Sequence, residues 1–62
     1  MNGKEKKNWM VNIQNAVDEA TAKAGIHVVK SVFKRFDARG LYDLNPSYYS
    51  EVFADLQQII SD

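Results

Sequence analysis

The strongest folding signal in the sequence is the stretch LNPSYYSEVFADLQQII, residues 44–60. Asn45 suits the N-cap position because its side-chain oxygen can accept a hydrogen bond from an otherwise unpaired backbone N–H. Pro46 suits the first helical position because its φ angle is already helical and it has no N–H to satisfy. Leu44 and Tyr49 stand on either side of this boundary at the positions of a hydrophobic staple. Three independent rules therefore predict that a helix begins at Pro46.

Apolar residues recur at helical spacing after this boundary, and the pattern predicts a helix over residues 46–61. The apolar face consists of Tyr49, Val52, Phe53, Leu56, Ile59 and Ile60. The opposite face consists of Ser50, Glu51, Ala54, Asp55, Gln57 and Gln58. A helix with one apolar face must pack against other elements of the same chain or of another chain.

A second helix is predicted over residues 26–38. The β-branched start of this segment, residues 26–29, suggests a strand when it is taken alone. The longer window favours a helix, because its apolar residues share one arc of a helical wheel. These residues are Ile26, Val28, Val29, Val32, Phe33 and Phe36. Gly40 is the expected residue just beyond the end of this helix.

A first helix is predicted over residues 5–24, with Gly25 as the glycine that ends it. Its apolar arc contains Trp9, Met10, Ile13, Ala16, Val17, Ala20 and Ala24. Asn8 is an alternative N-cap, and in that case residues 1–7 fray. Val11 falls on the far side of the wheel, so we expect it to be exposed or covered by another chain.

The sequence as a whole predicts an all-α fold, a small three-helix bundle that forms a single domain over residues 1–62. Hydrophobic residues make up 45% and charged residues 26%, an ordinary globular composition. In the connection between the last two helices, Leu41 and Leu44 are expected to close the end of the core. Tyr42 is then a half-buried lid or an exposed contact. So small a domain has a stability of a few kcal/mol, which favours association with itself or another protein.

The composition also bears on localisation. There is no cysteine, which fits a reducing compartment and excludes disulfides and thiolate chemistry. Polar residues at Asn12, Gln14 and Asn15 interrupt what would be the apolar part of a signal peptide. No apolar run approaches the roughly 20 residues that span a bilayer. We therefore expect a cytoplasmic protein with no membrane contact.

Opposite charges are separated along the chain. Residues 1–40 hold all eight basic and four acidic residues, a net charge of +4, and residues 41–62 hold the other four acidic residues, a net charge of −4. This asymmetry predicts that the acidic last helix packs beside the basic middle helix.

Catalytic and metal-binding patterns are weak. His27 lies on the polar face of the second helix next to Lys30, and cationic neighbours repel a divalent ion, so we interpret it as a surface histidine. Glu51 and Asp55 stand four residues apart on an exposed face, so we interpret them as surface carboxylates that favour solubility and not as a catalytic pair. We predict a protein that is not an enzyme and binds no metal or cofactor.

Binding surfaces are the better candidates for function. Val11, Tyr42 and Tyr48 are apolar or aromatic residues without a clear place in the core, and we predict that they contact another protein or a second copy of the chain. The alternative is nucleic-acid binding through the basic face of the second helix, by Lys30, Lys34 and Arg35. Residues 20–26 resemble the first half of a helix-turn-helix, but the recognition helix would need apolar residues at Ser31 and Lys34.

The segment VFKRFDARGLYDLNPSYYSEVFADLQQI, residues 32–59, resembles short uncharacterised proteins carried on conjugative transposons and related mobile elements of Gram-positive bacteria. The similarity lies in the basic-aromatic helix end, the leucine-containing turn and the Tyr-Tyr-x-Glu-Val-Phe sequence that opens the last helix. It implies an accessory protein of a bacterial mobile element. It implies no particular catalytic or binding residues.

Overall fold

The computed structural model describes residues 1–62 as five helical segments without a strand. The three α-helices are α1 (Gly3–Ala24), α2 (Ile26–Lys34) and α3 (Tyr49–Ser61). Two single turns of 3-10 helix, η1 (Leu41–Asp43) and η2 (Pro46–Tyr48), connect α2 to α3. The predicted all-α fold with three helices is confirmed.

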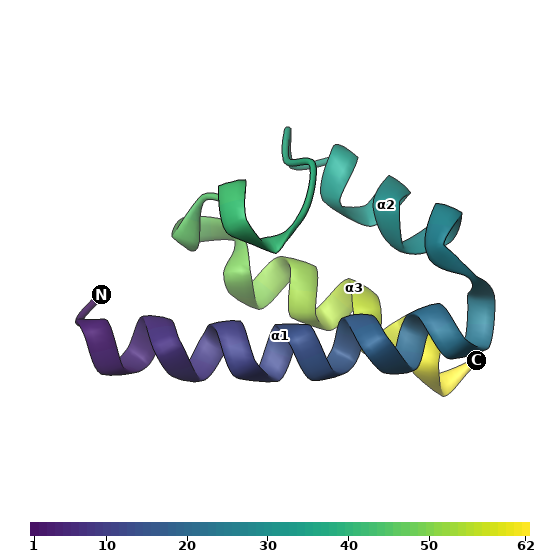
Figure 1. Cartoon of the computed structure of the whole chain (residues 1–62), viewed down its shortest axis with the longest axis horizontal. Coiled ribbons are helices and arrows are strands. Elements are labelled where there is room, and N and C mark those ends of the chain that lie inside the picture. The colour runs from purple at the N-terminus through teal and green to yellow at the C-terminus, as the bar shows by residue number, and fades with distance from the viewer.

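The helices α1 and α3 lie side by side and run in the same direction, whereas α2 runs back across them (Figure 1). Near their N-terminal ends, the Trp9 ring lies 6.5 Å from the Tyr49 ring and 6.0 Å from the Phe53 ring, measured between centroids. At the other end, the Lys23 ammonium donates a hydrogen bond to the Ile60 carbonyl at 2.8 Å. A cation at this position also interacts favourably with the helix dipole of α3.

One apolar core joins all three helices and the connection between α2 and α3. It contains Ile13, Ala16, Ala20, Val29, Val32, Phe33, Ala38, Leu41, Leu44, Tyr49, Val52 and Leu56. The prediction that Leu41 and Leu44 close the end of the core is confirmed, since both side chains are buried. No charged or polar residue is buried, so the core is held together by apolar packing.

The helix α1 begins at Gly3, two residues before the predicted start. Asn2 is its N-cap, and the Asn2 side chain accepts a hydrogen bond from the Glu5 N–H at 2.8 Å. The alternative N-cap at Asn8 is therefore wrong. Gly25 ends α1 as predicted, with φ 91° and ψ 160°, a backbone conformation that is essentially restricted to glycine.

The end of α2 differs from the prediction, because the helix stops at Lys34 and not near residue 38. Asp37 adopts a left-handed conformation, with φ 58°. The Asp37 N–H donates to the Lys34 carbonyl and the Ala38 N–H donates to the Phe33 carbonyl, both at 3.1 Å, the two bonds of a Schellman motif. Gly40, predicted to end the helix, has an extended backbone instead. An aspartate tolerates the left-handed region better than most residues, so glycine was not required here.

The apolar arc of α2 is also narrower than predicted. Val29, Val32 and Phe33 are buried, whereas Ile26 and Val28 remain 44% and 41% exposed. These two residues lie at the opposite edges of the arc, and the neighbouring helices α1 and α3 cover only its centre.

The predicted start of the last helix is confirmed in its capping chemistry. The Asn45 side-chain oxygen accepts hydrogen bonds from both the N–H and the hydroxyl of Ser47 at 3.0 Å, and Pro46 occupies the first helical position. The first turn, however, is the 3-10 helix η2, and regular α-helix begins only at Tyr49. Tightened first turns of this kind are common at helix ends.

Candidate functional site

The largest hollow on the surface is an open groove between the N-terminal half of α1 and the turn η1, with a volume of about 440 Å³. Gly3, Lys6, Lys7, Met10, Val11, Gln14, Asn15, Leu41 and Tyr42 line it. We call it the α1–η1 groove. Two of the three residues predicted to contact a partner, Val11 and Tyr42, therefore meet at one site.

The exposure of these two side chains follows from the elements that hold them. Val11 is 52% exposed because the core stripe of α1 passes through Ile13 and Ala16, on another side of the helix. Tyr42 is 91% exposed because its neighbours Leu41 and Leu44 take the buried positions of the connection. Tyr42 is therefore exposed and is not a half-buried lid.

Asp43, the residue after Tyr42, holds the turn η1 in place through hydrogen bonds. The Asp43 carboxylate accepts hydrogen bonds from the Arg39 N–H at 3.0 and 3.1 Å and from the Gly40 N–H at 3.1 Å. These bonds, first that from Arg39 and then that from Gly40, favour the ionised carboxylate and lower the pKa of Asp43 below its ordinary value. One wall of the groove therefore depends on a charged turn residue.

Tyr48 lies apart from the groove. Its ring packs against Phe36 just after α2, with the centroids 5.2 Å apart, and 38% of the residue remains exposed. The contact joins the end of α2 to the start of α3. The structure thus gives Tyr48 a packing role and leaves one edge of it open to solvent.

A second, smaller hollow adjoins the α1–η1 groove and lies between α1, α2 and the start of η1. Its volume is about 130 Å³, and it shares Gln14 and Leu41 with the groove. The other lining residues are Val17, Ile26, Val29, Lys30, Phe33, Arg39 and Gly40. We call this second hollow the α1–α2 hollow. Apolar side chains form its floor, while Lys30 and Arg39 supply positive charge.

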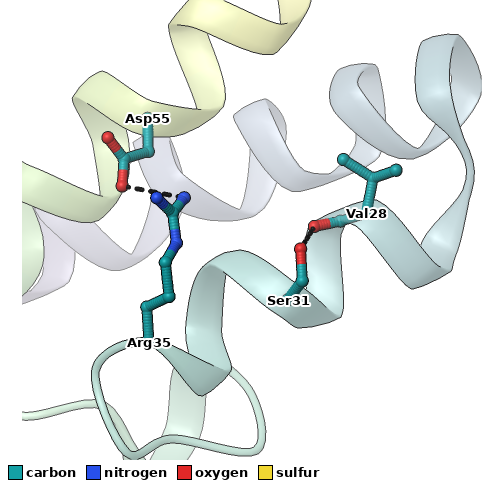
Figure 2. Close-up of polar contacts among 4 residues, drawn as sticks. All are labelled: Val28, Ser31, Arg35 and Asp55. Atoms are coloured by element: carbon teal, nitrogen blue, oxygen red, sulfur yellow. Dashed lines mark hydrogen bonds and ion pairs between the residues drawn. The ribbon is translucent and has the colours of Figure 1, made fainter.

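The three cations proposed for nucleic-acid binding are not equivalent. Lys30 and Lys34 line a shallow surface hollow of about 350 Å³ together with Arg39 and Ala38. Arg35 instead points toward α3, where its guanidinium lies 3.2 Å from the Asp55 carboxylate (Figure 2). The same view shows the Ser31 hydroxyl bonded to the Val28 carbonyl at 2.6 Å.

The ion pair between Arg35 and Asp55 agrees with the predicted charge complementarity of the middle and last helices. Both side chains are partly exposed, so the pair contributes at most about 1 kcal/mol. The main contact of α3 is nevertheless with α1, and it is apolar. Apolar burial, and not this ion pair, therefore supplies most of the stability of the fold.

The remaining candidate residues lie on the outer surface. His27 is exposed, as predicted, and Glu51 is exposed on α3 while Asp55 faces Arg35. No group of three or more histidine, cysteine, aspartate or glutamate side chains is placed to hold a metal ion. None of the helices has both the length and the apolar character needed to cross a bilayer.

Sequence reasoning missed Lys6 and Lys7, two cations that line the α1–η1 groove. A signal for Lys7 was present, because Lys7 and Val11 are four residues apart and therefore share one face of a helix. The place of Arg39 at the α1–α2 hollow could not be predicted in this way, since Arg39 follows the left-handed residue at the end of α2 and its position depends on that turn. Comparisons with protein families, with curated proteins and with solved structures gave no match for this chain.

Proposed function

We propose that this domain is a small non-enzymatic module that binds another protein through the α1–η1 groove. The main support for the proposal is that Val11 and Tyr42 line the same hollow. The two residues are far apart in the sequence, and both are exposed. Apolar side chains gathered in a surface hollow are characteristic of interaction sites.

The lining of the groove supports binding more than catalysis. Met10, Leu41 and Val11 offer apolar contact, and Gln14 and Asn15 offer amide groups for hydrogen bonds. The lining includes no carboxylate or histidine that would act as a general acid or base. A peptide segment is the kind of ligand that such a surface accommodates.

Selection from an unbiased displayed peptide library tests the proposal. The folded domain is immobilised, and the affinity of the recovered peptides is then measured for the wild type and for Val11→Asp and Tyr42→Ala. We expect each substitution to weaken binding at least tenfold, because it replaces apolar contact in the groove. Circular dichroism verifies that the variants remain folded.

Val28→Asp is the matched control, since Val28 is an exposed valine on α2 that does not line the groove. This variant should bind the peptides like the wild type. Recovery of no peptide, or equal loss of binding in Val11→Asp and Val28→Asp, would contradict the proposal.

The biological setting that we propose rests on the resemblance of residues 32–59 to proteins of mobile elements. In that setting the domain is a cytoplasmic accessory protein of a bacterial mobile element, and its partner is another protein of the same element. Sequencing the genes beside its own gene tests this setting, because transfer or relaxase genes should be present. A neighbourhood of housekeeping genes alone would contradict it.

Nucleic-acid binding is the second candidate, favoured by the joint position of Lys30, Lys34 and Arg39 around one hollow. This function predicts DNA affinity that falls steeply with salt. The double substitution of Lys30 and Lys34 by alanine should weaken it more than Arg35→Ala, since Arg35 faces Asp55. Absence of DNA binding at low salt would contradict a nucleic-acid-binding function.

A further inference from the structure

Four cations line the α1–η1 groove and the adjoining α1–α2 hollow. Lys6 and Lys7 line the groove, and Lys30 and Arg39 line the hollow. No acidic side chain lines either one. Two carboxylates lie nearby. Asp18 on α1 accepts a hydrogen bond from the Gln14 amide at 3.1 Å, and Asp43 in η1 accepts from the Arg39 and Gly40 N–H groups. The partner surface that complements this arrangement is apolar in its centre and acidic at its edges.

The geometry of the groove favours a helical partner. The chain contains no strand, so a partner cannot extend a sheet edge. Along α1 the lined surface runs from Gly3 to Val17, a distance of about 21 Å at the helical rise per residue. About four turns of a second helix cover this distance, which matches the way amphipathic helices dock in apolar grooves.

A second copy of this chain fits the groove poorly. In a symmetric dimer the same surface meets itself, which would bring Lys6, Lys7, Lys30 and Arg39 toward residues of the same charge. The acidic surface of the chain is on α3, but none of the exposed large apolar side chains belongs to that helix. In a head-to-tail contact, the α3 surface of one copy would therefore pair its acidic residues with the cations of the other copy. The apolar residues of the groove and the hollow would stay uncovered.

We infer that the α1–η1 groove and the α1–α2 hollow together bind an amphipathic helix of another protein that carries acidic residues along the borders of its apolar face. This inference rests on the proposed protein-binding function and adds the chemical class of the partner. Apolar contact with Met10, Val11 and Tyr42 contributes most of the affinity, and the four cations select the acidic partner.

A panel of three synthetic helical peptides of about 14 residues tests the inference. The peptides share one leucine face and differ only in the flanking residues, which are glutamate, glutamine or lysine. Fluorescence anisotropy measures their dissociation constants at about 0.1 M and about 1 M salt, where the Debye length falls from about 10 Å to about 3 Å. The glutamate peptide should bind at least tenfold tighter than the lysine peptide, and high salt should reduce this ratio.

Lys7→Glu and Lys4→Glu form a matched pair of variants. Both lysines are exposed near the start of α1, but only Lys7 lines the groove. Glutamate near a helix N-terminus is favourable, so both variants should fold. Lys7→Glu should weaken binding of the glutamate peptide about fivefold, whereas Lys4→Glu should leave it nearly unchanged.

Three results would overturn the inference. The lysine peptide could bind as tightly as the glutamate peptide, or Lys4→Glu could weaken binding as much as Lys7→Glu. The third is that a DNA oligonucleotide binds more tightly than any peptide. If no peptide of the panel binds while library-selected peptides do, the inference fails but the protein-binding function stands, so the two failures are distinguishable.

Discussion

The two sides of α1 are stabilised in different ways. On the side that packs on α3, Trp9 lies against Tyr49 and Phe53, and the core stripe of α1 is buried. On the side of α2 and η1, the covering elements are short and the surface is hollowed. There, turns and caps at Gly25, Asp37 and Asp43 determine where the covering elements lie. Apolar burial supports both sides, since Val29, Val32 and Phe33 belong to the same core, but on the second side the turns also decide where the short elements lie.

This difference explains why the candidate site lies where it does. A surface closed by interlocking apolar side chains has no room for a partner, whereas short elements held by hydrogen bonds leave apolar residues exposed between them. The same difference predicts which substitutions affect the folded core and which affect only the open side.

The largest effect is expected from truncation on the core stripe. Ile13 is fully buried, so Ile13→Ala should lower the free energy of unfolding by about 2–5 kcal/mol, through lost burial and the cavity that remains. Val11→Ala, two residues away, should change it by less than about 0.5 kcal/mol. Urea unfolding followed by circular dichroism measures both, with Ile13→Val, expected to cost about 0.5–1.5 kcal/mol, as a milder variant that stays folded. A large loss in Val11→Ala would mean that the groove surface belongs to the core.

The second largest effect separates two glycines on the open side. A Cβ atom at Gly25 or at Gly40 meets nothing within 4 Å, so the two positions differ only in backbone conformation. Gly25→Ala should cost about 1–3 kcal/mol because of the positive φ angle. Gly40→Ala should leave stability unchanged or raise it by up to about 1 kcal/mol. Thermal unfolding of the two variants tests this, and equal effects would contradict it.

A smaller effect of the opposite sign is expected at the end of α2. Asp37→Gly should raise the free energy of unfolding by about 0.5 kcal/mol, because glycine adopts the left-handed conformation without a Cβ penalty. Asp37→Ala should lower it, since alanine tolerates that conformation less well than aspartate. Chemical denaturation should therefore rank the variants glycine, aspartate, alanine. A ranking with alanine first would show that Asp37 does not end α2 in solution.

The smallest effect is a pH dependence at Asp43, whose carboxylate is open to solvent. Because the pKa of Asp43 is lowered in the folded protein, its ionised form stabilises the fold above the unfolded-state pKa of about 3.9. That contribution is lost as the pH falls through the lower folded-state pKa. The stability difference between the wild type and Asp43→Asn should therefore shrink as the pH falls from about 5 to below the folded-state pKa. A difference independent of pH would contradict the bonds from Arg39 and Gly40.

Local signals predicted most of the helical structure. The start at Asn45 and Pro46 was predictable because a cap and a proline act within one turn of the chain. Gly25 was predictable because this helix end needs a positive φ angle, which glycine adopts more easily than any other residue. Asn2 was overlooked as the cap of α1, although its spacing to Glu5 is ordinary capping geometry.

The end of α2 could not be predicted from the same local rules of capping and glycine preference. Gly40 was the stronger local candidate, but the chain had already turned at Asp37, where Ala38 enters the core beside Phe33. Burial of Ala38 and the two hydrogen bonds of the turn outweigh the small cost of a left-handed aspartate. The exposed edges of α2, Ile26 and Val28, likewise depend on how much of the helix its neighbours cover.

By itself, the sequence determined three amphipathic helices, their main boundaries and the exposure of Val11, because caps and periodicity act between residues a few positions apart. Only the tertiary structure decided that Val11 and Tyr42 share a groove, that Arg39 replaces Arg35 beside Lys30 and Lys34, and that Tyr48 packs on Phe36. These contacts join residues on different elements. The distances between these residues depend on how α2 and η1 pack against α1. No periodicity within one helix encodes that placement.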